Sequence, residues 1–180
     1  MLKTQTRTFC LLSAAFVLTL LAGCASTPSS STLISEANAA LNTMIDRDPG
    51  LQDWVDEAYG YAMFPNIGKG GLWLGGGFGR GIVFEQGEPV GRTSVSQGTI
   101  GAQIGAQSYS QVIFFRDKTE LRRFQGEKFK FSAQATAVAA TEGAAATTSY
   151  SQGVAVFIHA RGGLMAEATV GGQKFRYWSL

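Results

Sequence analysis

The chain has 180 residues, of which 45% are apolar and 16% charged, which fits one globular domain and excludes an intrinsically disordered chain. Glycine is frequent at 23 residues, but the chain has only 4 prolines and no Gly-X-Y period. This composition excludes collagen and indicates tight turns and closely packed strands. The formal net charge of +2 would by itself be compatible with nucleic-acid binding, but it depends on the first residues of the chain.

The first residues have the pattern of an export signal. Lys3 and Arg7 form a basic start, and residues 9–21 form an apolar run that is too short to span a bilayer. The run ends in Leu21-Ala22-Gly23-Cys24, which resembles the lipobox of bacterial lipoproteins. We therefore expect residues 1–23 to be a lipoprotein signal peptide and Cys24 to carry fatty acyl chains such as palmitate. An ordinary secretory signal with an incidental Cys24 is the alternative.

The residues after the lipobox predict a tether and one domain. Residues 24–32 contain the acylated cysteine and a tether rich in Ser, Thr and Pro, and residues 33–180 form the domain. Removal of Lys3 and Arg7 lowers the 15 basic side chains to 13, against 13 acidic ones, so the mature chain is neutral and no nucleic-acid partner is expected. Ala25 and Ser26 follow Cys24 without an aspartate, which in a Gram-negative host resembles the signal for the outer membrane.

The first part of the domain predicts two helices. Apolar residues recur at helical spacing over residues 32–47 and again from Leu51 to Ala58. Between them, Asp48-Pro49 predicts an N-cap followed by proline at the first helical position. The first helix has Glu36 and Asp46 but no lysine on its polar face, so we expect it to pack against the domain and not to lie on a membrane.

From Gly60 onward the apolar pattern has a period of two and predicts a series of short strands. Gly171-Gly172 predicts a two-residue hairpin between the last two strands. One helix interrupts the series, with Asp117 in a capping box at its start and Gly126 at its end. The predicted strands cover residues 61–64, 71–78, 81–85, 91–97, 99–106, 109–116, 128–139, 147–159, 164–170 and 174–178. These elements predict an α+β fold with a strand-rich, curled or barrel-like antiparallel sheet, N-terminal helices and one inserted helix.

The side chains needed for catalysis or metal binding are scarce in the sequence. His159 is the sole histidine and Cys24 the sole mature cysteine, so a metal site rich in these ligands is excluded. No Gly-x-Ser-x-Gly elbow accompanies His159, and a structural histidine at a strand end is the favoured interpretation. We expect no catalytic residues, no metal and no cofactor, and therefore a protein that is not an enzyme.

Two groups of residues are candidates for anion binding. In the glycine-rich segment 68–81, neither a phosphate-binding Walker loop nor a dinucleotide fingerprint fits, but Lys69 in a glycine-flanked turn could hold an anion. Four further cations lie within nine residues at 122–130. In Lys128-Phe129-Lys130-Phe131 the alternation places both lysines on one strand face. A solvent-facing strand over a core explains that pattern equally well.

Several blocks of the sequence, in order, resemble the SYLF domain, which is also called the yeast-type actin-binding domain. The blocks are residues 61–71, 79–81, 96–107, 124–131, 149–151 and 162–175. The last block and the lipobox together resemble the bacterial lipoprotein branch of the family. The resemblance implies a non-enzymatic lipid-binding module that prefers anionic headgroups, including phosphoinositides in eukaryotic members. Some eukaryotic members also bind actin, which is not expected of an exported bacterial lipoprotein.

These observations predict a membrane-anchored lipoprotein in the cell envelope, on the outer membrane of a Gram-negative bacterium, whose domain binds anionic phospholipid headgroups. The alternative is a structural or interaction lipoprotein that binds an envelope protein or glycan. The candidate headgroup-binding residues are Lys69, Arg80, Arg122, Arg123, Lys128 and Lys130.

Overall fold

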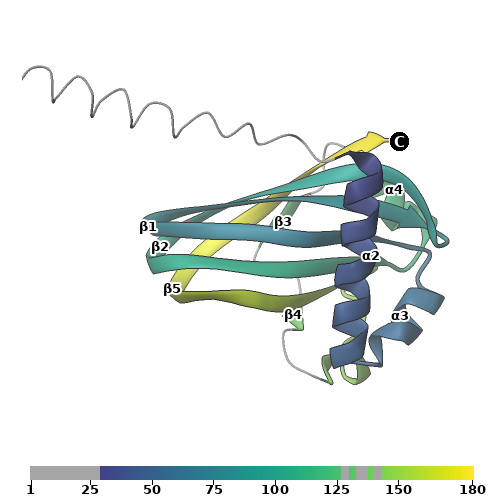
Figure 1. The fold of residues 1–180 in the computed structure, drawn as a ribbon, viewed down its shortest axis with the longest axis horizontal. Helices are drawn as coiled ribbons and strands as arrows, with labels where there is room; N and C mark the ends of the chain where they lie inside the picture. The colour runs from purple at the N-terminus through teal and green to yellow at the C-terminus, as the bar shows by residue number, and fades with distance from the viewer. Residues whose placement is uncertain (1–28, 127–129, 133–137, 140–142) are drawn as a thin grey trace, which may run out of the picture.

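The computed structural model describes residues 29–126, 130–132, 138–139 and 143–180 (Figure 1). Two helices come first and a third lies between long strands, which confirms the predicted α+β class. The elements in chain order are α2 (Ser30–Arg47), α3 (Leu51–Glu57), β1 (Gly60–Glu85), β2 (Glu88–Phe115), α4 (Lys118–Gln125), β3 (Lys130–Ser132), β4 (Val138–Ala139), the 3-10 turn η1 (Ala144–Ala146) and β5 (Val154–Ser179). None of the helices in these residue ranges combines the length and apolar character needed to cross a membrane.

Three long antiparallel strands form most of the sheet, which has the order β1-β2-β5-β3, with β4 paired in parallel to β5. β1 turns into β2 at Gln86 and Gly87, whose φ angles are 51° and 85°. β5 pairs with β2 along nearly its whole length, from Ser179 opposite Gly91 to Val154 opposite Phe115. β2 is therefore the central strand of the sheet.

The predicted short strands merge into these long ones, and two predictions are wrong. Gly171 and Gly172 do not form a hairpin, because they lie within β5 opposite Thr99 and Gly98. Glycine has no side chain to pack, so it lets a strand bend sharply without ending. The strand predicted from residue 147 begins only at Val154, after a turn. Of the strand predicted at residues 128–139, the structure describes β3 and β4, and the rest lies outside the described residues.

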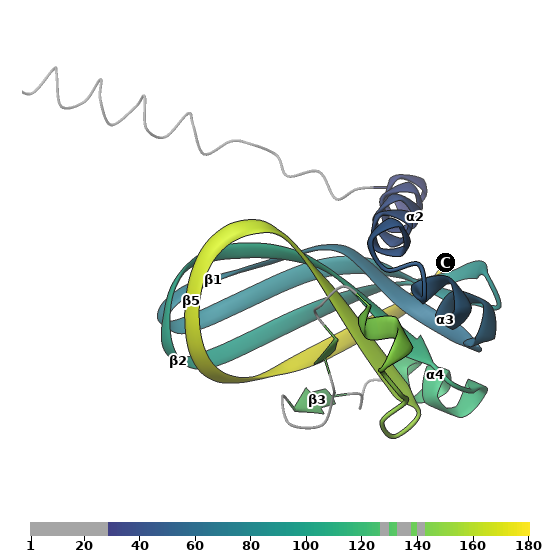
Figure 2. The same ribbon diagram turned by 90° about the horizontal axis from the view of Figure 1, so that it is seen from below.

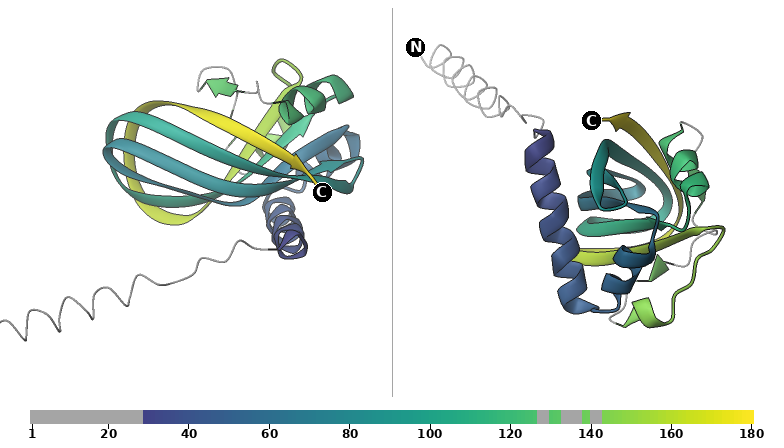
Figure 3. Two further views of the ribbon diagram at one scale, coloured as in Figure 1. Left: turned by 90° about the horizontal axis from the view of Figure 1, so that it is seen from above. Right: turned by 90° about the vertical axis from the view of Figure 1, so that its right-hand side faces the viewer.

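The sheet curls back on itself without closing, as the sequence predicted (Figures 2 and 3). The two halves of β1 approach so closely that a Cβ built at Gly81 would lie 2.4 Å from the carbonyl oxygen of Met63. A Cβ at Gly60 would lie 2.5 Å from the carbonyl oxygen of Phe84. Only glycine permits this backbone contact, so part of the glycine excess serves the curl.

The helices begin and end at residues with identifiable caps. α2 begins after Ser29, whose Oγ accepts a hydrogen bond from the Thr32 N–H at 3.2 Å. The prediction that Asp48 caps the second helix is wrong, because its N–H donates to the Met44 carbonyl at 2.9 Å and thereby ends α2. The Asp48 carboxylate instead accepts from the Ala145 N–H at 2.9 Å and ties η1 to this corner. α3 begins after Gly50, which has no side chain to cap it.

Side chains that alternate between the two faces of the strands create two cores. Tyr61 and Met63 belong to an outer core under α2 and α3, while Ala62 and Phe64 face the interior of the curl. Trp54 of α3 closes the outer core by packing on neighbouring aromatic rings and donating its Nε1–H to the Ala145 carbonyl at 3.2 Å.

The other two helices pack on opposite sides of the sheet. In the interior core, α4 contributes Leu121 and Phe124. α2 buries Leu33, Ala37, Ala40, Leu41 and Met44. The prediction that the first helix packs against the domain is confirmed.

Candidate functional site

The cations predicted to bind headgroups lie in three different places. Lys69 is on the first half of β1, opposite Gln107, while Arg80 is on the second half, after the bend. Arg122 and Arg123 are exposed on α4. Lys130 begins β3 and pairs with Lys174 of β5, and Lys128 lies outside the described residues. The structure therefore does not gather the described members of the set on one surface.

Arg80 instead belongs to a different group of side chains, on the outer face of the sheet's second half. Antiparallel partners point to the same side, so the register aligns them in rows. We call the resulting surface the open face. Its rows are Phe78 with Ser96 and Lys174, Arg80 with Ser94 and Arg176, and Arg92 with Trp178.

The open face is basic and contains no acidic side chain. Arg92, Lys174 and Arg176 are exposed and Arg80 is half-buried. Within the described part of the chain, none of these four cations forms an ion pair. The chain thus concentrates uncompensated positive charge on one sheet face, which raises the local concentration of anions.

Two large aromatic side chains lie among these cations. Phe78 is 53% exposed and Trp178 is 47% exposed. The Arg80 guanidinium lies 5.8 Å from the centroid of the Phe78 ring, a cation–π distance. Aromatic rings beside exposed cations suit a boundary between water and an apolar phase, because the rings can enter the apolar side while the charges stay with polar groups.

The open face begins where the helical cover ends. Ile82, which follows Arg80 on the same side of β1, is fully buried in the outer core under α2. The end of β5 lies beside the first turn of α2 (Figures 1 and 3).

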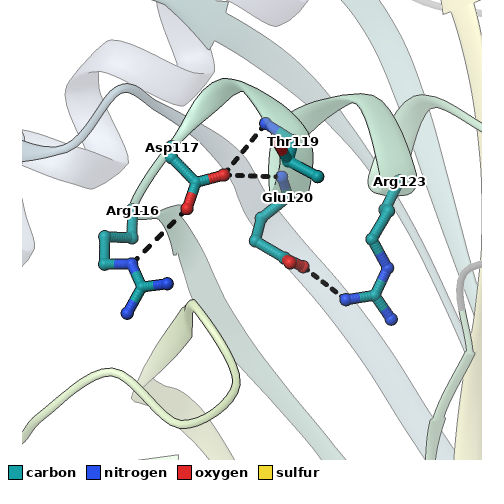
Figure 4. A network of polar contacts seen from close by, with 5 residues as sticks. All are labelled: Arg116, Asp117, Thr119, Glu120 and Arg123. Atoms are coloured by element: carbon teal, nitrogen blue, oxygen red, sulfur yellow. Dashed lines mark hydrogen bonds and ion pairs between the residues drawn. The ribbon is translucent and has the colours of Figure 1, made fainter.

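The α4 cations occupy a separate, partly compensated surface (Figure 4). Asp117 caps α4 by accepting from the N–H groups of Thr119 at 2.9 Å and Glu120 at 3.1 Å. Its bond from the Glu120 N–H is the main cause that lowers the pKa of the Asp117 carboxyl, and the neighbouring Arg116 guanidinium adds to it. Arg123 donates to the Glu120 carboxylate at 2.7 Å. This pairing leaves α4 less suited than the open face to bind an anion.

Sequence reasoning missed Arg92, Lys174 and Arg176. A signal for Lys174 and Arg176 exists in the alternation of Lys174-Phe175-Arg176-Tyr177-Trp178, in which Phe175 is buried and its two basic neighbours are exposed. Their meeting with Arg80 depends on the pairing of three distant strands, which a local pattern does not reveal. The described part of the chain also contains no group of three His, Cys, Asp or Glu side chains that could hold a metal ion.

Comparisons with known proteins agree with the predicted resemblance. A family model described as "Ysc84: Las17-binding protein actin regulator" matches residues 96–177. The chain is also similar to Beta cell expansion factor A of Aeromonas veronii, with 31% identity over 153 residues. That alignment covers 79% of this chain and 57% of the relative, so the chain spans little more than half the relative's length.

Proposed function

Because the chain carries a domain of the SYLF family, we propose that it is a membrane-anchored lipoprotein whose domain binds anionic phospholipid headgroups through the open face. The family is one of binding modules, which supports a role without catalysis. The observation that carries the proposal is the gathering of Arg80, Arg92, Lys174 and Arg176 around two exposed aromatic rings, with no carboxylate among them.

The charges of the open face are sufficient for measurable binding. Each Lys or Arg near an anionic membrane surface contributes on the order of 1 kcal/mol of attraction, so four such side chains bind a vesicle appreciably. This attraction falls as salt is added, because exposed charges are screened. The aromatic rings add contact that salt does not weaken.

The predicted anchor is close in sequence to the start of α2. Cys24 precedes Ser30, the first residue of α2, by six positions, which allows a separation of about 20 Å at most. The start of α2 is beside the end of β5 (Figure 3), so acyl chains on Cys24 would hold the open face near the same bilayer. We place that bilayer in the cell envelope, at the outer membrane.

A vesicle sedimentation experiment tests the headgroup proposal separately from the anchor. Residues 29–180, without Cys24, are mixed with vesicles of phosphatidylcholine alone or with added phosphatidylglycerol. We expect binding only to the anionic vesicles and a steep loss between low and high salt. The affinity of the double variant Arg92→Ala/Arg176→Ala for these vesicles should be at least about tenfold lower, because each cation contributes on the order of 1 kcal/mol.

The α4 surface provides a matched control. Arg122→Ala/Arg123→Ala removes two exposed cations from another place in the chain and should leave vesicle binding nearly unchanged. If this pair and the open-face pair weaken binding equally, the net charge and not the open face is responsible. Absence of binding to every vesicle would favour the alternative, an envelope protein or glycan as partner.

A further inference from the structure

A second surface feature, distinct from the open face, lies between α2 and the sheet. It is a groove of about 410 Å³, within the size range of small-molecule sites. α2 forms one wall with Glu36, small alanines and Thr43. The sheet forms the other wall with Pro65, Asn66, Ser110, His159 and Arg161. The groove thus brings together charged and polar side chains from four separate segments.

Two β-bulges meet at this groove. In β1, Pro65 and Asn66 together oppose the single residue Ser110 of β2. In β5, Arg161 is the extra residue between Ala160 and Gly162, which pair with consecutive residues of β2. Bulges redirect side chains and occur often beside functional sites. Here one lies on each side of β2, and both contribute to the same wall.

The bulged backbone is held by side-chain hydrogen bonds. The Pro65 carbonyl accepts from the Ser110 hydroxyl at 2.8 Å and from Arg161 Nη1 at 2.7 Å. Ser110 is 2% exposed, so its bond is protected from water. The Arg161 guanidinium, which is exposed, is fixed by one N–H and retains further N–H groups for a ligand.

Opposite charges face the groove without pairing. Glu36 on α2 and Arg161 on β5 both line it, but within the described residues neither forms an ion pair. Such an arrangement suits a ligand that is itself bipolar and bridges the two walls. The planar guanidinium matches the oxygens of a phosphate, and a carboxylate accepts hydrogen bonds from a primary amine.

We propose that this groove binds a phosphate joined through a short linker to a primary amine, the chemistry of O-phosphoethanolamine. The phosphate lies at Arg161 and the ammonium group at Glu36. This chemistry is available from a free small molecule or from the headgroup of phosphatidylethanolamine. The site is independent of the open face, so either proposal can fail without the other.

The test uses the full chain in micelles of a non-ionic detergent. O-phosphoethanolamine is titrated by calorimetry and by NMR of the imidazole protons of His159, which is the chain's sole histidine and lines the groove. Ethyl phosphate, which lacks the amine, is the matched ligand. We expect O-phosphoethanolamine to bind about tenfold more tightly than ethyl phosphate, as a charge-assisted hydrogen bond contributes. Glu36→Gln should remove that difference, and Arg161→Gln should weaken both ligands.

Two controls separate the groove from the rest of the molecule. Lys174→Ala on the open face should leave these affinities unchanged, and Arg161→Lys should retain part of the phosphate affinity if loss in Arg161→Gln reflects charge. Glu36 is exposed on α2, so Glu36→Gln should keep the fold, which circular dichroism checks. Equal affinities for the two ligands, or a Glu36→Gln variant with the preference intact, would overturn the proposal.

The source of the ligand is distinguished in lipid nanodiscs. If a membrane headgroup occupies the groove, nanodiscs of phosphatidylethanolamine should shift the His159 resonances and nanodiscs of phosphatidylcholine should not. If a free molecule is the ligand, both nanodiscs should give the same spectrum, and added O-phosphoethanolamine should shift it. No shift under any of these conditions would also overturn the proposal.

Discussion

The same three strands build two halves of very different character. In the first half, residues 60–67, 109–115 and 154–158, both faces are buried. The outer face packs against α2 and α3, and the inner face packs in the interior core. In the second half, residues 75–81, 91–98 and 172–179, the inner face is equally apolar at Val95 and Phe175, but the outer face is basic and open. Within each half the side chains alternate between the two faces, and what differs between the halves is whether a helix covers the outer positions.

This difference separates stability from binding. Substitutions in the covered half should affect folding, and those on the open face should affect binding with little effect on folding. Substitutions in each half test this division.

The largest effect on stability is expected from Phe114→Ala. Phe114 is fully buried and packs against Trp54, Tyr61 and Phe157, with ring centroids 5.8–5.9 Å apart. Loss of a buried phenylalanine typically lowers the free energy of unfolding by about 3–5 kcal/mol. Phe78→Ala on the open face should change it by less than about 0.5 kcal/mol. Urea denaturation of both variants measures the contrast, and similar losses would show that the open face is also part of the core.

A smaller loss of stability is expected where the halves of β1 touch. A Cβ at Gly81 would meet the Met63 carbonyl oxygen, whereas a Cβ at Gly98 meets nothing within 4 Å. Overpacking typically lowers the free energy of unfolding by about 1–3 kcal/mol, so Gly81→Ala should be destabilised and Gly98→Ala should not. Thermal unfolding followed by circular dichroism distinguishes them. If both variants unfold like the wild type, the close approach is not required for folding.

Removal of one aromatic ring from the open face should affect vesicle binding at high salt more than at low salt. Trp178→Ala removes contact that salt does not screen, so its relative loss of binding should grow as the electrostatic attraction weakens. Sedimentation with anionic vesicles at two salt concentrations checks this. Arg92→Ala should give the opposite trend, and equal salt dependence for both variants would contradict separate roles.

The smallest effect is expected at the start of α4, outside both halves of the comparison. Asp117→Asn keeps a side-chain oxygen that can cap the helix but removes the charge, so the melting temperature near neutral pH should fall only slightly. Because the pKa of Asp117 is lowered by folding, the charge stabilises the protein above the carboxyl's usual pKa of about 4 and ceases to do so as the pH falls through the lowered value. Melting curves from neutral to acidic pH should therefore converge for wild type and variant. A difference that persists at low pH would exclude this cause.

Local patterns predicted much of the fold. The helix over residues 32–47, the cap at Asp117 and the end at Gly126 are confirmed, since each depends on neighbours within one helical turn. The same reasoning failed at Gly171-Gly172, because a pair of glycines permits both a tight turn and a bent continuous strand. Only the pairing with β2 decides between them.

The candidate site was less predictable than the fold. Arg80 was identified from the sequence, but its companions Arg92, Lys174 and Arg176 come from strands far apart in the chain. Their alignment is set by register, and bulges change the register locally. The groove under α2 depends even more on such irregularities, because both of its bulges lie in strands that the alternating pattern describes as regular.

The pairing of β5 with β2 also affects when the sheet can form during synthesis. Gly91 pairs with Ser179, 88 positions further along the chain, so the central strand lacks one neighbour until β5 has been synthesised. Pairings this distant in sequence form slowly. For the exported lipoprotein proposed above, such a delay would favour passage through an export channel, because folding would not be complete before β5 has been synthesised.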